Sequence, residues 1–317
     1  MNSAPIKIGI VGLGKIARDQ HIPALRANSN FELVAVTSKS GAKLPNVPTY
    51  HQLSEMLEGV ADIAAVSFCT PPQGRYALAR QALEQGLHVM LEKPPGTTTA
   101  EIEDLAARAL EKGVTLFSSW HSRAAPAVQR ARTWLANRTI HSVVIRWKEN
   151  VRQWHPGQQW IWEPGGLGVF DPGINALSLI TAILPQTLLV TEAQLSYPAN
   201  RDMPIAAKLK LCDGAGMFID AEFDFRQIGE QTWDIVVDTD AGRLRLAHGG
   251  ATMHIDGRSI TLDPGAEYPT LYKHFAQLVR SNRSDVDFTP LRLVADAFLL
   301  ARREIVEPFY DEPPAIA

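Results

Sequence analysis

Apolar residues in the first third of the chain gather in short continuous runs, and segments with helical spacing lie between them. The apolar runs span residues 6–11, 31–37, 63–68, 88–91 and 114–117, and the helical segments span residues 16–27, 53–57, 76–84 and 102–112. A short continuous apolar run is typical of a strand that is buried on both faces of a parallel sheet. The alternation therefore predicts a doubly wound α/β domain over residues 1–120.

After about Trp120 the pattern changes to an alternation of apolar and polar positions. Residues 217–225, 233–237 and 243–246 alternate in this way, and Asp213-Gly214 and Asp256-Gly257 are typical of hairpin turns. Amphipathic helices are expected over residues 268–280 and 291–303. Residues 121–317 are therefore predicted to form an α+β domain with a largely antiparallel open sheet.

One alternating segment, residues 143–151, has a carboxylate on its apolar face. Ile145, Trp147, Glu149 and Val151 share that face of the expected strand. This position marks Glu149 as a candidate binding residue.

The composition is that of an ordinary globular protein. The 317 residues are 45% hydrophobic and 21% charged, and the net charge of −3 with no basic run argues against nucleic acid or a membrane surface as a partner. The most apolar long segment, residues 168–184, contains Asp171 and Asn175 and is not expected to span a membrane. Cys69 and Cys212 form neither a disulfide framework nor a metal cluster, so we expect a cytoplasmic protein without a metal.

The first apolar run ends in Gly12-Leu13-Gly14-Lys15-Ile16-Ala17, which has the spacing of a dinucleotide-binding loop. Gly12 permits a tight turn, Gly14 lets a pyrophosphate approach the backbone, and Ala17 lets the helix pack close to the strand. The N–H groups at the helix N-terminus would then face the phosphates. Because the loop follows an apolar strand and enters a helical segment, it favours a Rossmann domain with a bound dinucleotide over a bare strand–helix turn.

The end of the second apolar run bears on which dinucleotide would bind. An NAD site usually has Asp or Glu at that point to accept hydrogen bonds from the ribose. This chain has Thr37-Ser38-Lys39, which supplies a hydroxyl and an ammonium and no carboxylate that would repel a 2′-phosphate. We expect Ser38 and Lys39 to favour NADP, with NAD also usable; a polar turn with a solvated lysine is the alternative.

Three further segments carry candidate chemistry. Cys69-Thr70-Pro71 and Glu92-Lys93-Pro94 follow buried strands, at the edge where parallel sheets bind ligands. Lys93 can stabilise negative charge on a substrate oxygen, although a solvated lysine before a proline turn explains it equally well. Asp171-Pro172 is an ordinary helix start with Asp at the N-cap. Residues four apart share a helix face, so Asp171 and Asn175 can also point at one substrate.

These segments resemble the glucose–fructose oxidoreductase/inositol dehydrogenase family of nicotinamide-dependent sugar oxidoreductases. The matching segments are residues 12–17, 21–24, 69–72, 92–94 and 165–175. Residues 120–123, 146–149 and 154–162 resemble those members of the family that oxidise L-arabinose or D-galactose at C1. The resemblance implies NAD(P)-dependent oxidation of such a sugar to the aldonolactone, with the sugar bound between the two domains. L-Arabinose is the first expected substrate and D-galactose the second.

The resemblance also assigns roles to individual residues. The expected catalytic residues are Lys93, Asp171 and Asn175. The expected cofactor contacts are Gly12, Gly14, Lys15, Ile16, Ser38, Lys39, Cys69, Thr70, Pro71, Glu92 and Lys93. The expected sugar contacts are His121, Glu149, Trp154, His155, Asp171, Asn175 and Trp233. Asn175 stands where the family usually has a titratable histidine, so we expect Asp171 to accept the proton and Lys93 to polarise the substrate.

Two other functions stay open at this point. One is a dehydrogenase that acts on another sugar or inositol carbon, which Asn175 in place of histidine makes less favoured. The other is a non-catalytic dinucleotide-binding regulator, against which the intact set of Lys93, Asp171 and Asn175 speaks. By analogy with the family, a homodimer or homotetramer is expected.

Overall fold

The structure is a computed structural model that describes residues 4–184 and 186–311. Its internal contacts divide the chain into two compact units. The first unit covers the chain up to residue 124 together with residues 266–288, and the second covers residues 125–265 and the chain from residue 289 onward. The domain boundary predicted after residue 120 differs from this division, because it placed residues 266–288 in the C-terminal domain.

The first unit contains a six-stranded parallel sheet with the strand order β3-β2-β1-β4-β5-β6. Its strands are β1 (Ile6–Val11), β2 (Phe31–Thr37), β3 (Thr49–Tyr50), β4 (Ala65–Phe68), β5 (His88–Glu92) and β6 (Leu116–Ser119). Its helical segments are η1 (Ala17–His21), α1 (Ile22–Arg26), α2 (Leu53–Gly59), α3 (Arg75–Glu84), α4 (Thr99–Lys112), η2 (His121–Ala124) and α8 (Glu267–Ser281). β4 and β6 are buried along their whole lengths, as a two-sided parallel sheet requires. The predicted Rossmann domain is confirmed.

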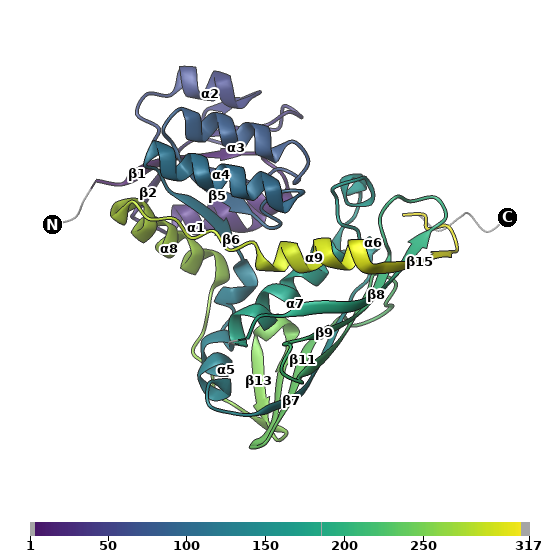
Figure 1. Cartoon of the computed structure of the whole chain (residues 1–317). Helices are drawn as coiled ribbons and strands as arrows, with labels where there is room; N and C mark the ends of the chain where they lie inside the picture. The colour runs from purple at the N-terminus through teal and green to yellow at the C-terminus, as the bar shows by residue number, and fades with distance from the viewer. Residues whose placement is uncertain (1–3, 185, 312–317) are drawn as a thin grey trace. The chain divides into compact units, whose positions relative to one another are not determined.

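The helix α8 explains why residues 266–288 belong to the first unit. A doubly wound sheet must be covered on both faces: α3 and α4 cover one, and α1 and α8 cover the other (Figure 1). Tyr272 and Phe275 of α8 pack in the same buried cluster as Ile8 and Ile10 of β1. Asp285 then pairs with the edge strand β6, since its N–H donates to the Leu116 carbonyl at 3.0 Å. The helical pattern of residues 268–280 was read correctly, but hydrophobic periodicity does not say which sheet a helix covers.

The second unit contains a nine-stranded sheet with the order β14-β13-β12-β11-β7-β10-β9-β8-β15. Its strands are β7 (Ile140–Lys148), β8 (Leu189–Pro198), β9 (Ala206–Cys212), β10 (Phe218–Asp224), β11 (Thr232–Thr239), β12 (Gly242–Ala247), β13 (Thr252–Ile255), β14 (Arg258–Ser259) and β15 (Ala301–Val306). Its helical segments are α5 (Val128–Leu135), α6 (Val151–Trp154), η3 (Gln159–Trp162), α7 (Phe170–Ile183), η4 (His248–Gly250) and α9 (Thr289–Leu300). The pairs β7–β10 and β8–β15 are parallel and the other pairs are antiparallel, which confirms the predicted, largely antiparallel open sheet.

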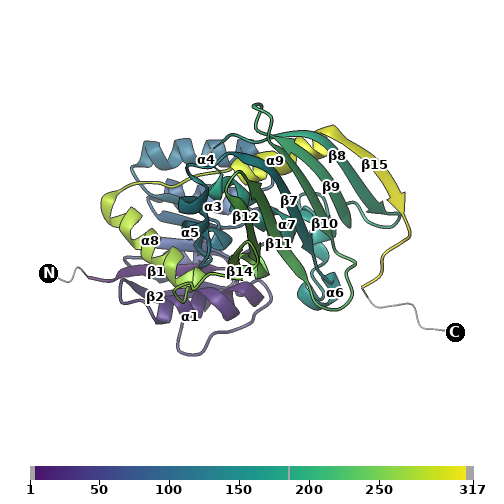
Figure 2. The same ribbon diagram turned by 90° about the horizontal axis from the view of Figure 1, so that it is seen from below.

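Two element boundaries differ from the predictions. The expected helix over residues 291–303 ends at Leu300, and residues 301–306 form β15 at the edge of the sheet beside β8 (Figure 2). Pairing with the exposed edge of β8 satisfies main-chain groups, a gain that a side-chain pattern does not reveal. The strand β7 ends at Lys148 and not at residue 151 as predicted. Asn150 is the N-cap of α6, since its side chain accepts the Arg152 N–H at 3.0 Å.

Within residues 4–184 and 186–311, no helix is both long and apolar enough to cross a membrane.

Candidate active site

The cofactor residues predicted from the sequence lie along one edge of the parallel sheet. The strands β2, β1, β4 and β5 are consecutive neighbours and run parallel, so their carboxyl ends meet at the same edge. The residues that follow these ends are Ser38, Gly12, Cys69 and Lys93. Ligands of open α/β sheets bind at this edge, at the point where the strand order reverses, which here lies between β1 and β4.

The loop after β1 has the geometry that a dinucleotide requires. Gly12 has a φ of +97°, and a Cβ added to it would lie 2.9 Å from Thr70 Cγ2, so a larger residue would be both strained and crowded. A Cβ added to Gly14 would meet no neighbouring heavy atom of the described residues within 4 Å. Gly14 therefore faces open space into which a pyrophosphate could approach, and the loop fits the group. Lys15, next to it, is paired with Asp19 on the loop's helix.

The segment after β2 presents one buried and one exposed polar residue. Ser38 is buried, its N–H donates to the Tyr50 carbonyl at 2.9 Å, and its hydroxyl lies 3.2 Å from the hydroxyl of Ser40. Lys39 is exposed. Because Lys39 is exposed and Ser38 is buried, only the Lys39 side chain of these two can change rotamer to reach a 2′-phosphate.

The turn after β5 is held from two sides. The Glu92 carboxylate is buried, and its Oε2 accepts the Lys93 N–H at 2.8 Å. The Arg75 guanidinium donates to the carbonyls of Glu92, Pro94 and Thr70. Burial alone would raise the pKa of Glu92, but the hydrogen bond and charge of His21 outweigh it and bring the pKa to about 2. Glu92 is therefore a buried carboxylate that fixes the backbone of Lys93.

In the second unit, four of the predicted sugar-binding residues lie in one row of polar contacts. Trp233 Nε1 donates to Glu149 Oε2 at 2.8 Å, and His155 Nε2 lies 2.9 Å from Glu149 Oε1. His155 Nδ1 lies 3.6 Å from Asp171 Oδ2 on the other side of the imidazole. Glu149 and Asp171 are only 2% and 3% exposed. Glu149 directly follows β7, and its burial confirms that the carboxylate on the apolar face of residues 143–151 points inward.

Indole rings flank this row. The ring of Trp154 lies 4.9 Å from that of Trp233, which stacks on Trp147 at 6.0 Å. Trp154 is 37% exposed, so a flat apolar surface is accessible beside a set of hydrogen-bonding groups. That combination suits a sugar, which has hydroxyls on its rim and C–H groups on its faces.

Asp171 does not cap its helix, contrary to the sequence reading. The helix α7 begins at Phe170 with Val169 at the N-cap, so Asp171 lies within the first turn. The chain enters the helix earlier because the Phe170 and Asp171 N–H groups donate to the Leu167 and Gly168 carbonyls. Asn175 lies four residues further along the same helix and is half-buried.

His121 is placed within the first unit. Its Nδ1 lies 2.8 Å from Glu267 Oε2, and its ring stacks on Tyr268 at 5.7 Å. No role was predicted for His21, Tyr268 or Tyr272. The first two contact the Glu92 carboxylate, and Tyr272 contacts His21. Two signals were available for them: His21 lies in a family-like segment, and Tyr268 and Tyr272 are one helical turn apart.

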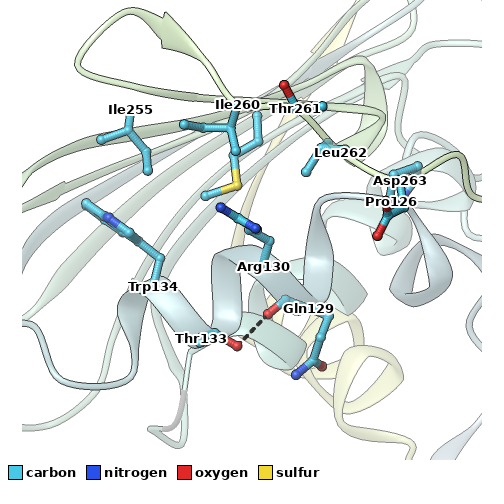
Figure 3. Close-up of a pocket in the computed structure, with 11 residues that line it drawn as sticks. Pro126, Gln129, Arg130, Thr133, Trp134, Ile255, Ile260, Thr261, Leu262 and Asp263 are labelled. Carbon is cyan, nitrogen blue, oxygen red and sulfur yellow. Dashed lines mark hydrogen bonds between the residues drawn. The ribbon is translucent and has the colours of Figure 1, made fainter.

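A hollow of about 570 Å³ lies elsewhere in the second unit, between α5 and residues 253–263. Figure 3 shows Arg130 and Trp134 of α5 directed toward Ile255 and Ile260. None of the predicted catalytic, cofactor or sugar residues is among those that line it.

Comparison with known proteins identifies the family of this chain. Residues 6–119 match the model of an oxidoreductase family with an NAD-binding Rossmann fold. The galactose 1-dehydrogenase of Pseudomonas fluorescens is 49% identical over 307 residues, which cover 97% of this chain and 99% of that protein. The chain belongs to the glucose–fructose oxidoreductase/inositol dehydrogenase family. It is therefore an oxidoreductase with a dinucleotide-binding domain.

Two solved structures agree with the fold. A D-galactose-1-dehydrogenase protein from Rhizobium etli has a TM-score of 0.93 at 52% identity, covering 98% of this chain and 99% of that one. A 3-ketoreductase from Actinomadura kijaniata, solved with NADP and TDP-benzene, has a TM-score of 0.83 at 22% identity, covering 95% of this chain and 99% of its own. The second likeness concerns the fold alone.

Proposed function

We propose that this protein is a sugar 1-dehydrogenase that oxidises D-galactose, and L-arabinose as a second substrate, at C1 to the aldonolactone, with NADP preferred over NAD. The observation that carries the proposal is the row of Trp233, Glu149, His155 and Asp171, with two buried carboxylates, beside an exposed indole. The relative named galactose 1-dehydrogenase, which matches nearly the whole chain, supports the choice of sugar.

In the proposed reaction, Asp171 accepts the proton of the anomeric hydroxyl while C1 loses a hydride. When bound, the oxidised nicotinamide accepts that hydride. Asp171 is buried beside His155, which lies between it and Glu149 and so orients both carboxylates. Asn175 is one turn further along α7 and holds a neighbouring hydroxyl through its amide.

Lys93 is proposed to donate from Nζ to the anomeric oxygen. A cation at that point stabilises the negative charge that grows on the oxygen as the proton leaves. The buried Glu92 carboxylate and the Arg75 guanidinium hold the main chain on both sides of Lys93, so the lysine stem starts from a fixed backbone. Such prior positioning is a large part of what a protein contributes to this kind of reaction.

D-Galactose and L-arabinose are proposed together because they share the configuration from C1 to C4 and differ at C5. A pocket that is open at C5 would accept both. The additional exocyclic group of the hexose would then change the transition-state free energy by about 1–3 kcal/mol.

The decisive experiment incubates purified protein with NADP or NAD and a panel of sugars, and follows the absorbance of the reduced nicotinamide. D-Galactose and L-arabinose are expected to react, and D-glucose and myo-inositol to react poorly. Methyl β-D-galactopyranoside, whose anomeric oxygen is blocked, serves as the matched control and is expected to be inert. Reaction of the methyl glycoside at the rate of galactose would move oxidation to another carbon, and dinucleotide binding without turnover of any sugar would favour a regulator.

A further inference from the structure

The first unit contains a buried polar network centred on Glu92. Glu92 Oε1 accepts the hydroxyl of Tyr268 at 2.6 Å and lies 3.0 Å from His21 Nε2. On the other side of the imidazole, His21 Nδ1 lies 2.7 Å from the hydroxyl of Tyr272, which donates to Ser67 Oγ at 3.2 Å. His21 and Tyr272 have no exposed surface. The network therefore joins α8 to η1, β4 and β5 through side chains that water does not reach.

The protonation states in this network are defined by its contacts. Burial alone would lower the pKa of His21, but Cys69, Tyr272 and the Glu92 carboxylate raise it well above its usual value. Burial and the Glu92 charge raise the pKa of Tyr268, which therefore stays a hydroxyl donor. The centre of the network is thus an imidazolium–carboxylate pair, and hydrogen bonds to ionised groups are the stronger ones.

Covering the sheet does not require such a network. An apolar helix face covers a sheet without removing ionised groups from water, and replacing a buried ion pair by well-packed apolar side chains is often neutral or stabilising. Unlike an apolar face, this network ends in a hydrogen bond to the main chain of Lys93. The second oxygen of Glu92, Oε2, accepts the N–H of Lys93 at 2.8 Å.

We propose that His21, Tyr268 and Tyr272 are positioning residues for Lys93 in sugar oxidation. They fix the Glu92 carboxylate, which in turn fixes the main chain from which the Lys93 side chain extends. Residues 266–288 then belong to the catalytic apparatus of the Rossmann unit as well as to its core. This inference rests on the role proposed for Lys93 under Proposed function.

The test compares Tyr268→Phe with Tyr76→Phe in galactose oxidation. Both variants remove one hydroxyl that donates to a carboxylate of the first unit, and the bond from Tyr76 goes to Asp104, which contacts neither Glu92 nor Lys93. Tyr268→Phe is expected to lower kcat about 10- to 100-fold while the Kd for NADP stays within about twofold. Tyr76→Phe is expected to keep both values. His21→Gln is a second variant and is expected to lower kcat at least as much.

A double-mutant cycle separates positioning from a general structural effect. If Tyr268 acts through Lys93, adding Tyr268→Phe to Lys93→Met changes the residual rate by less than about twofold, whereas independent effects multiply. A Tyr268→Phe enzyme with unchanged kcat, a loss explained by weaker NADP binding, or a multiplicative double mutant each overturns the inference. A fully active Lys93→Met enzyme instead overturns the role proposed for Lys93 itself.

Discussion

Trp233 Nε1 donates a 2.8 Å hydrogen bond to Glu149 Oε2. Trp233 belongs to β11, and Glu149 directly follows β7, the strand that pairs with β11. The other oxygen of the same carboxylate lies 2.9 Å from His155 Nε2. Both oxygens of Glu149 are therefore engaged, which accounts for a charge that is almost fully buried. The carboxylate joins the exposed indole region to the His155–Asp171 contact.

Because the Glu149 carboxylate contacts both Trp233 and His155, Glu149→Gln tests the role of this row in sugar binding. Glutamine keeps the size of the side chain but removes the charge that holds both neighbours, and hydrogen bonds to charged groups contribute about 1.5–3 kcal/mol. We expect kcat/KM for galactose to fall roughly 10- to 150-fold, with an unchanged Kd for NADP. Glu222→Gln is the matched control, since Glu222 pairs with Arg146 and Lys148 in the same sheet. Equal kinetics for the two variants would remove Glu149 from the site.

Lys93→Met is expected to separate chemistry from cofactor binding. Methionine keeps the length of the stem and removes the donor, so kcat for galactose should fall by about 10²–10⁴. The Kd for NADP and the thermal unfolding temperature should stay close to the wild-type values. Lys112→Met, at the end of α4 in the same unit, is the control and should change neither. Steady-state kinetics with galactose decide the outcome, and substantial retained turnover would take Lys93 out of the mechanism.

The choice between NADP and NAD is predicted to depend on Lys39 and Ser38. Lys39→Ala removes an exposed cation and should weaken NADP binding without affecting NAD. Ser38→Asp places a carboxylate where it repels the 2′-phosphate and should shift the preference further toward NAD. Because Ser38 is buried, this variant is also expected to lose some stability, which Lys39→Ala should not. The ratio of the two Kd values, measured by titration, gives the answer; an unchanged ratio in both variants would mean that other residues set the preference.

The sequence predicted the architecture well where side-chain patterns decide it. The continuous apolar runs located the parallel strands, and the alternation over residues 143–151 located an inward carboxylate at Glu149, directly after β7. The path of residues 266–288 was not predictable in this way, because an amphipathic helix shows only that one of its faces is buried. The strand β15 was missed because main-chain pairing with an edge strand leaves little trace in the side chains.

The network around Glu92 was missed for a related reason. Its members His21, Glu92 and Tyr268 are far apart in the sequence, and each taken singly is an ordinary residue. A buried carboxylate needs partners, but the sequence does not show that Glu92 is buried with its oxygens turned inward. By contrast, the glycine loop was predictable from the sequence, since the Gly12 turn and the open space at Gly14 depend on local geometry alone.

The stability of the protein should depend on pH through the His21–Glu92 pair. The pKa of Glu92 is about 2 in the folded protein against 4.5 ordinarily, so its contribution is complete above pH 4.5 and is lost as pH falls through about 2. The pKa of His21 is raised above 6.5, so its contribution is complete below pH 6.5 and is lost as pH rises through the raised value. The pair therefore stabilises the fold most between pH 4.5 and 6.5. In that window Glu92→Gln should lower the free energy of unfolding by about 3–5 kcal/mol.

Urea denaturation of wild type and Glu92→Gln at several pH values checks this dependence. The difference between them should shrink both below pH 4.5 and well above pH 6.5, since one partner loses its charge in each direction. Glu84→Gln is the control, because solvent screens the exposed Glu84–Arg80 pair and its loss should change stability little at any pH. A difference for Glu92→Gln that stays constant across the whole range would show that the pair is not charged in the folded protein. In that case His21 would hold Glu92 through a neutral hydrogen bond.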